Sequence, residues 1–238
     1  MAELSSYLPE GGAAARLGML APLDPEERQL LDRAPDLKYQ VAAHHIIIED
    51  GCPVSSPSII LSGWACRTRI FLDGRRQILS LLVPGDLIGV CRQSLPVAAT
   101  GAIALTDVTL CPAPMPEYGK GGLAEAYARS GALEEFYLFR QIARLGRMSA
   151  YERIADLLLE IGERLSPVLR TPHDRFPFPL TQETLADLLG LTSVHVNRML
   201  QLFRRQGLLD VRGGTAHIRD LAQLADLVEH RRALVSEA

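Results

Sequence analysis

The chain has 238 residues, of which 47% are hydrophobic and 22% are charged, and its formal net charge is −3 at pH 7. This is the composition of a globular protein, and it excludes a disordered or fibrous chain. At about 150 residues per domain the length suits one large or two small domains, and the net charge excludes a protein that is basic throughout.

The beginning of the sequence lacks the basic and apolar segments of a signal peptide, and no uncharged stretch is long enough for a membrane helix. We therefore expect a cytoplasmic protein without membrane attachment. The cysteines form no CxxC pair, so a zinc ribbon or thioredoxin-like motif is unsupported. They are Cys52, Cys66, Cys91 and Cys111.

Short apolar runs separated by Gly, Pro and Asp fill residues 38–115. Residues 46–48, 59–61 and 78–83 are typical of buried strands, and Asp73-Gly74 between two such runs favours a hairpin. We expect an N-terminal tail at residues 1–20 and a β-sandwich or jelly-roll domain at residues 21–120.

Residues 123–147 contain no proline and predict one long helix. Its apolar residues lie on more than one side, which favours a second chain as partner, although burial within one domain is the alternative. Ser149 and Glu152 form a capping box that starts the next helix, and Pro167 should end it at about Ser166. We assign residues 121–148 to a dimerisation helix and residues 149–238 to a second domain.

Residues 180–219 predict two short helices joined by a turn. Thr181 caps the first helix, Gly190 ends it, and Thr192 caps a second helix that runs to about Gln206. On the second helix one side is apolar, with Val196, Met199, Leu200 and Phe203. The opposite side carries Val194, Asn197, Arg198, Gln201 and Arg205.

Such a pair of helices is a helix-turn-helix. The outward side chains of the second helix include hydrogen-bond donors of the kind that read guanine and adenine in the major groove. The alternative interpretation is that this face is simply exposed to solvent. A hairpin with Gly213-Gly214 at its turn follows as a wing, whose amides and Arg212 would hold phosphate. Residues 190–219 carry a charge of +4, which leaves −7 on the rest of the chain.

These features together resemble the Crp/Fnr superfamily of bacterial transcription regulators, most specifically at residues 74–89 and 181–200. The resemblance implies an α+β protein with a cyclic-nucleotide-binding-like jelly roll, a long dimerisation helix and a C-terminal winged helix-turn-helix. It implies a homodimer on palindromic double-stranded DNA, with RNA polymerase as a further partner.

The resemblance also implies roles for individual residues. Arg198 matches the guanine-reading arginine, while Val194 replaces a frequent glutamate and would contact a thymine methyl group. Ser193 and Asn197 also fall at base-contacting positions. Thr181 and Gln182 fall near phosphate, and His195 at the helix flank would contact phosphate or be structural. The full DNA-contacting set is Thr181, Gln182, Thr192, Ser193, Val194, His195, Asn197, Arg198, Gln201, Arg205 and Arg212.

The sensor domain has the outline of a phosphate-binding cassette without its chemistry. Val90 stands where cyclic-nucleotide-binding relatives have Glu, and residues 98–102 contain no Arg. A cyclic phosphate buried without a cation would be costly, so we expect no cyclic-AMP binding of the family's kind. The candidate effector pocket comprises Gly85, Asp86, Leu87, Ile88, Gly89 and Val90.

We expect no cofactor. Residues 1–51 contain no cysteine, so three ligands of the iron–sulfur cluster of the oxygen-sensing branch are absent. The cysteines are then interpreted as small buried hydrophobic residues. The alternatives are a redox role for the thiols and haem ligation by His44 or His45, which open a strand-like run.

An enzyme is not indicated, because no phosphate-loop, dinucleotide, zinc-protease or serine-hydrolase motif occurs. Glu134 and Glu135 are paired carboxylates, but we interpret them as solvated helix residues. The remaining alternative is a ligand-binding dimer whose C-terminal helices contact protein instead of DNA.

Overall fold

The computed structural model describes residues 8–54, 56–90, 97–116, 120–170, 172–231 and 233. The chain begins with α1 (Gly12–Gly18), α2 (Pro25–Arg33) and a short 3-10 helix (Ala34–Leu37). Leu17 and Leu20 are buried among residues of the β-domain and of the long helix. The segment that we assigned to a tail therefore contains a helix that packs into the sensor half.

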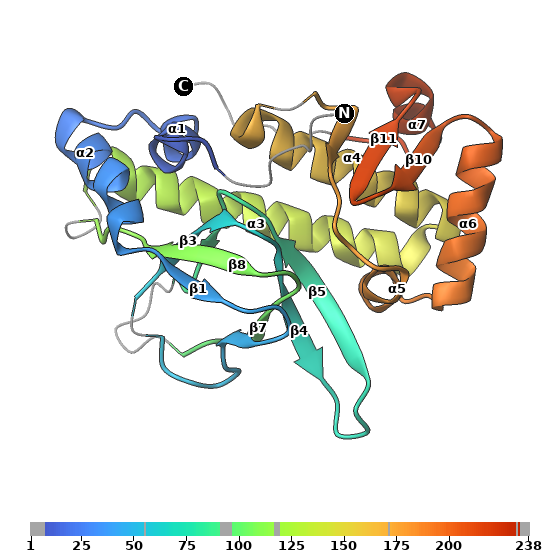
Figure 1. Cartoon of the computed structure of the whole chain (residues 1–238), viewed down its shortest axis with the longest axis horizontal. Helices are drawn as coiled ribbons and strands as arrows, with labels where there is room; N and C mark the ends of the chain where they lie inside the picture. The colour runs from blue at the N-terminus through green and yellow to red at the C-terminus, as the bar shows by residue number, and fades with distance from the viewer. Residues whose placement is uncertain are drawn as a thin grey trace.

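Two antiparallel four-stranded sheets form the β-domain within the described residues (Figure 1). The first sheet has the order β1 (Tyr39–Val41), β8 (Val108–Pro112), β3 (Ser58–Ser62) and β6 (Leu87–Ile88). The second has the order β2 (Ile46–Ile48), β7 (Gly101–Ala104), β4 (Ala65–Ile70) and β5 (Arg76–Leu82). The predicted jelly roll and the hairpin turn at Asp73-Gly74, between β4 and β5, are confirmed.

The prediction that residues 46–48 are buried was wrong. Ile46 is 60% exposed, and Ile47 and Ile48 are only partly buried. Among the described strands, β2 lies at the edge of its sheet and pairs only with β7. An apolar run predicts a strand, but which faces are covered depends on the strand's place in the sheet.

Two long helices follow the β-domain, α3 (Gly122–Arg147) and α4 (Ala150–Leu169). Ser149 and Glu152 form the expected capping box at the start of α4. The helix does not end at Pro167, which lies in its last turn. Leu165 and Val168 are buried there, so packing holds the last turn helical despite the proline.

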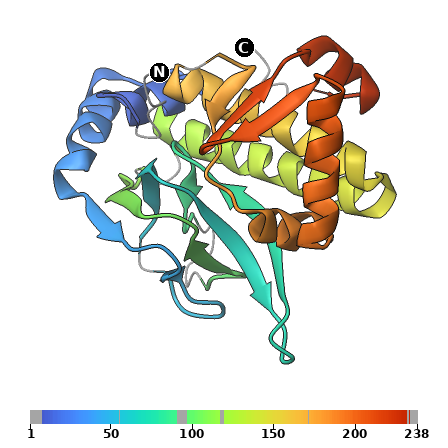
Figure 2. The same ribbon diagram turned by 45° about the vertical axis from the view of Figure 1, so that its right-hand side comes forward.

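The C-terminal part contains the predicted winged helix-turn-helix. Its helices are α5 (Gln182–Leu189), α6 (Ser193–Arg205) and α7 (Leu221–Leu227). A three-stranded sheet has the order β10 (Leu209–Arg212), β11 (Thr215–Ile218) and β9 (Arg175–Pro177). β10 and β11 form the wing, which projects beside α6 (Figure 2).

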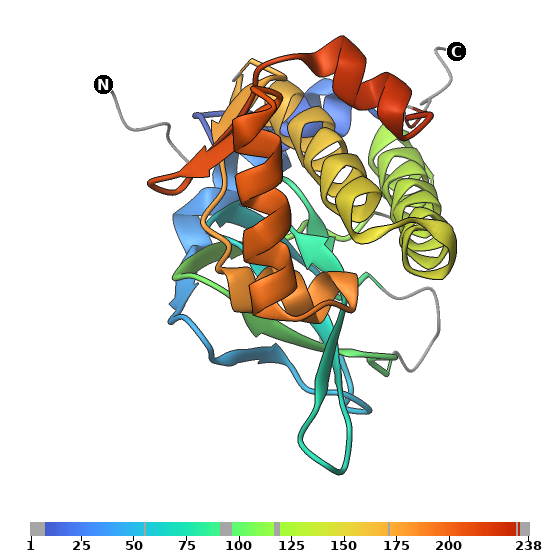
Figure 3. The same cartoon turned by 90° about the vertical axis from the view of Figure 1, so that its right-hand side faces the viewer.

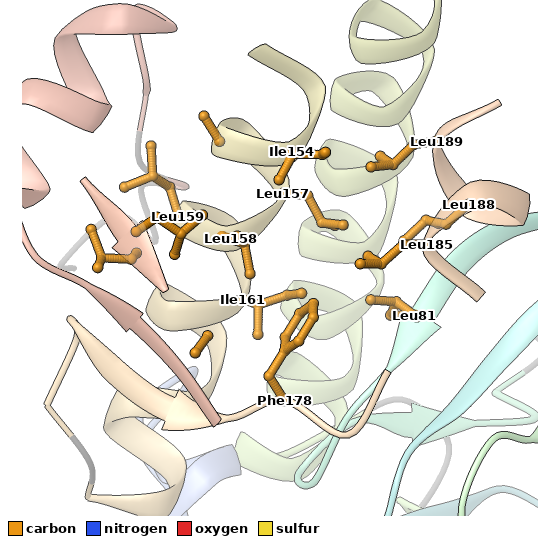
Figure 4. Close-up of a cluster of buried hydrophobic side chains, with 14 of the residues drawn as sticks. Leu81, Ile154, Leu157, Leu158, Leu159, Ile161, Phe178, Leu185, Leu188 and Leu189 are labelled. Carbon is orange, nitrogen blue, oxygen red and sulfur yellow. The ribbon is translucent and has the colours of Figure 1, made fainter. Parts of the chain in front are cut away.

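One hydrophobic core joins the two halves. Leu81 of β5 lies next to Leu185 and Leu188 of α5, with Leu158 of α4 and Phe178 close by (Figure 4). Trp64, Cys66, Ile78 and Val83 of the β-domain belong to the same buried cluster. The position of the helix-turn-helix is therefore determined partly by the sensor strand β5.

Candidate nucleic-acid interface

Local capping interactions position the two helices of the helix-turn-helix. The Thr181 hydroxyl accepts a hydrogen bond from the Thr184 amide at 3.1 Å, and the Thr192 hydroxyl accepts one from the His195 amide at 3.2 Å. Gly190 ends α5 with a φ of +63°, which glycine adopts without strain. The turn between the helices thus follows directly from these three residues.

The two faces of α6 differ as the spacing predicts. Val196 and Phe203 are fully buried, and Tyr151 of α4 stacks on Phe203 with ring centroids 3.9 Å apart. On the other side Val194 is 77% exposed, and Arg198 is also exposed. In Figure 3, α6 lies at the front of the molecule.

A row of amide side chains connects α5 to the exposed face of α6. Asn197 Nδ2 donates to Gln182 Oε1 at 3.0 Å, and Gln201 Nε2 donates to Asn197 Oδ1 at 2.7 Å. The structure thereby brings together three residues from the sequence-predicted set. Their mutual hydrogen bonds hold the amides in one orientation along the exposed face.

The arginines of this region differ in whether a carboxylate neutralises their charge. Arg204 and Arg212 both contact Asp210, with Nε–Oδ1 distances of 2.9 and 3.2 Å. Arg198 and Arg205 have no ion pair within the part of the chain that the structure describes. Their charges therefore remain available on α6.

The other predicted contact residues lie around this face. Thr181, Thr192 and Ser193 are exposed at the starts of α5 and α6, whereas His195 is half-buried at the flank of α6. Arg212 is exposed at the wing, where Gly213 and Gly214 form the turn with positive φ angles. These residues therefore lie on α5, on α6, at the turn between them and at the wing.

Comparison with known proteins identifies the family. Residues 38–117 match the cyclic nucleotide-binding domain, and residues 152–227 match the Crp-like helix-turn-helix domain. The transcriptional activator protein FnrL of Cereibacter sphaeroides is 31% identical over 205 residues, which cover 80% of this chain and 79% of FnrL. The chain belongs to the Crp/Fnr family of transcription regulators.

Other Crp/Fnr proteins agree with this assignment. The nitrogen fixation regulation protein FixK of Bradyrhizobium diazoefficiens is 29% identical over 171 residues, covering 71% of this chain and 72% of FixK. The solved structure of FixK2 from Bradyrhizobium japonicum has a TM-score of 0.69 at 26% identity, and the match covers 83% of this chain and 98% of that chain. The expected α+β architecture is the one shared with these Crp/Fnr proteins.

The sensor half of this Crp/Fnr chain contains a cavity of about 470 Å³ between β4, β5 and α3. Gly89 and Val90 line it, together with Ala98 and Thr100. Arg67 is the one cation among its described lining residues, and its Nε lies 2.5 Å from Glu134 Oε1. Sequence reasoning missed Arg67 and was wrong to treat Glu134 as merely solvated, because residues 67 positions apart in sequence form this pair.

The six candidate effector residues divide between different places. Asp86 and Leu87 line a smaller cavity at the junction with α1, α3 and α4, whereas Gly89 and Val90 line the larger one. Ile88 is buried, and Gly85 has a φ of +92° in the turn before β6. The structure therefore does not bring them together as a single pocket.

Cys66 and Cys111 are buried thiols, and Cys52 is partly buried. Burial raises the pKa of Cys66 to about 12 and that of Cys111 to about 11, so both remain protonated near neutral pH. Cys91 lies outside the described residues. The expectation of small buried residues is confirmed for Cys66 and Cys111.

His44 and His45 do not open a strand. They are exposed in the turn before β2, and His44 has a φ of +66°. The described residues contain no group of three or more His, Cys, Asp or Glu that could hold a metal ion. The described helices also include none that is long and apolar enough to cross a membrane.

Proposed function

We propose that this Crp/Fnr protein binds palindromic double-stranded DNA as a homodimer and inserts α6 into the major groove. The observation that carries the proposal is the exposed face of α6, where Arg198 has no ion pair with the described residues and lies on the same helix as Asn197 and Gln201 of the amide row. Arginine and amide side chains make the bidentate contacts that distinguish guanine and adenine.

Each predicted contact residue takes one of two roles in this proposal. Ser193, Val194, Asn197, Arg198 and Gln201 read bases, with Arg198 on a guanine and Val194 on a thymine methyl group. Binding of Asn197 to adenine exchanges its hydrogen bonds with Gln182 and Gln201 for bonds to the base. The phosphate-contacting residues are Thr181, Gln182, Thr192, His195, Arg205 and Arg212.

Helix α3 is the proposed dimer element. Phe139 is 62% exposed and Ile142 is 67% exposed, and Phe136 lies one turn earlier on the same helix. Aromatic and aliphatic side chains at this spacing suit a helix pair, which would remove them from water. The pair would place two α6 helices on half-sites about 34–36 Å apart, one turn of DNA.

We further propose that cyclic AMP is not the effector. The 470 Å³ cavity offers Arg67 as a cation, but Glu134 already neutralises it at 2.5 Å. Among the described lining residues, a cyclic phosphate there would find no free positive partner. Calorimetric titration should therefore detect no micromolar binding of cyclic AMP.

A regulator of this kind acts on the chromosome, so we place it in the cytoplasm with RNA polymerase as a partner. The experiment that tests the DNA proposal is selection of binding sites from a random duplex pool, followed by anisotropy titrations of the selected site. A palindrome that loses affinity when its half-sites are moved apart by five base pairs, half a turn, is expected. Equal affinity for selected and random duplexes would contradict it.

A further inference from the structure

A small cavity lies at the junction of four elements, and it is separate from the 470 Å³ cavity of the sensor half. Its volume is about 30 Å³, and it is bounded by α1, β5, α3 and α4. The polar residues that line it include Arg16, Ser80, Asp86, Tyr137 and Arg164. Glu134 lines both cavities, so this residue forms part of the wall between them.

Two buried hydrogen-bond donors at this junction have no acceptor in the part of the chain that the structure describes. Arg164 Nε and Ser80 Oγ are buried atoms without a hydrogen-bond partner, and the Arg164 side chain is only 9% exposed. The Arg16 guanidinium makes neither a hydrogen bond nor an ion pair with the described residues. Buried polar groups are normally satisfied, so two such donors on one small cavity, with Arg16 beside them, point to an acceptor that the described residues do not supply.

The acids nearby are already engaged. Asp86 Oδ2 accepts from Arg164 Nη2 at 2.5 Å and from the Val83 amide at 2.8 Å. Glu160 accepts from Arg144 at 2.6 Å and from Arg164 Nη1 at 3.2 Å, and Glu134 is paired with Arg67. Burial lowers the pKa of Arg16, although the charge of Asp86 opposes this effect. An added anion would offset the cost of keeping Arg16 charged.

We propose that this junction cavity binds a small oxyanion through Arg16, Ser80 and the Nε of Arg164. A water molecule needs about 10–15 Å³ of such space, so a cavity of about 30 Å³ suits an anion of about three heavy atoms, such as formate, and is small for sulfate. The Tyr137 ring covers Arg164, whose Cζ lies 4.8 Å from the ring centroid, and so limits access of water.

The anion would tie the DNA-binding half to the sensor half. Arg164 belongs to α4, Ser80 to β5 and Arg16 to α1, so one ligand would contact three separate elements. Gly85 allows these elements to approach, because a Cβ there would lie 2.9 Å from Val168 Cγ1 and 3.2 Å from Arg16 Cγ. Binding should therefore stabilise the docked arrangement of α1 and α4 against the turn at Gly85.

The test is thermal unfolding of the full chain, without DNA, in a series of sodium formate, chloride and sulfate at constant ionic strength. Formate should raise the unfolding temperature along a saturable curve, and the two other anions should not. Arg16→Gln and Ser80→Ala should each weaken the formate midpoint by about tenfold or more, because each removes a hydrogen bond to a charged group. Arg75→Gln is the matched control, because Arg75 is an exposed arginine in the β4–β5 turn.

Calorimetric titration of formate into the wild-type chain supplies the second measurement and does not depend on how the variants fold. Ser80→Ala removes a single oxygen atom, and it tests the site by itself if Arg16→Gln fails to fold. A linear rise with the same slope for all three anions, or an unchanged midpoint in a folded Ser80→Ala variant, would overturn the proposal. Because no step involves DNA, failure here leaves the DNA-binding proposal unaffected.

Discussion

Arg76 of β5 and Asp187 of α5 form an ion pair across the two halves of the chain, with Nη2 and Nε of Arg76 at 2.6 and 2.9 Å from Asp187 Oδ2. Gln77 reinforces the contact by donating to the Asp187 carbonyl oxygen at 2.8 Å. The side chains are 29% and 27% exposed, so solvent screens the pair. It fixes the relative position of strand and helix more than it stabilises the fold.

The apolar contact beside this pair should contribute far more to stability. Leu81→Ala removes a buried side chain from the core shared with Leu185 and Leu188 and should lower the free energy of unfolding by about 2–5 kcal/mol. Arg76→Ala should cost at most about 1 kcal/mol. Urea denaturation measures both, with the exposed Leu72→Ala as control. Similar losses for Leu81→Ala and Arg76→Ala would refute the shared core.

Arg198 and Arg212 should affect DNA binding in different ways. Arg198→Ala should cost about 1–3 kcal/mol on the selected operator and relax the preference at one base pair, because a base contact carries sequence information. Arg212→Ala should weaken operator and random duplex alike and reduce the salt slope by about 1. Anisotropy titrations on both duplexes separate the two effects. An equal loss on both duplexes for Arg198→Ala would remove its base-reading role.

Arg144 should be among the most sensitive charged positions in the protein. Its side chain is buried between α3 and α4, and it donates to Asp156 at 2.9 Å and to Glu160 at 2.6 Å. Arg144→Met leaves two buried carboxylates without this partner and should cost about 3–5 kcal/mol. Denaturant unfolding measures the loss. Arg75→Met, at an exposed arginine, should change stability by at most about 0.5 kcal/mol.

His230 should make stability depend on pH. Burial lowers the pKa of His230 and the charge of Arg140 opposes protonation, but hydrogen bonds to Asp156 and Glu163 outweigh both effects and raise the pKa above its usual 6.5. The protonated histidine is therefore favoured in the folded state. The contribution of His230 to the free energy of unfolding is fully present below about pH 6.5, and it is lost as the pH rises through the raised pKa of the folded state.

The measurement is the free energy of unfolding from pH 5.5 to 9 for wild type and His230→Gln. The difference between the two proteins should be largest at the acidic end and should shrink at the alkaline end. His44→Gln, at the surface before β2, is the reference for losing a histidine. A difference that grows with pH would mean that the neutral form is the one stabilised by folding.

Phe139 should control the oligomeric state. Phe139→Glu places a charge on the exposed apolar face of α3 and should convert a dimer into a monomer at micromolar concentration, because the charge would be buried in a helix pair. Sedimentation velocity reports the change. Leu72→Glu, at the exposed tip of the β4–β5 hairpin, should leave the sedimentation coefficient unchanged. A Phe139→Glu protein that remains dimeric would exclude α3 as the dimer element.

Sequence reasoning succeeded where the determining contacts are local. Thr181, Thr192 and Ser149 bind amides three residues away, and Gly190 needs only its own backbone angle, so spacing alone predicted these helix boundaries. The division of α6 into a buried apolar face and an exposed polar face could also be predicted, because Val196 and Phe203 lie on one face of a regular helix.

The contacts that shape the sensor cavities are not local, and sequence spacing gave no signal for them. Arg67 reaches Glu134, and Arg164 reaches Asp86 across 78 positions. The end of α4 was mispredicted for a different reason. The rule that proline ends a helix considers only the proline, whereas the burial of Leu165 and Val168 keeps the last turn helical. Both kinds of information require the packed tertiary structure.

The shared core also limits how the two halves can be recombined. Leu185 and Leu188 are covered by Leu81, which belongs to the sensor strand (Figure 4). A chimera that joined residues 149–238 to an unrelated sensor would expose these leucines to water unless the new sensor offered an apolar strand at the same place. The exchangeable unit in this protein therefore includes the C-terminal half together with the face of β5 that it packs against.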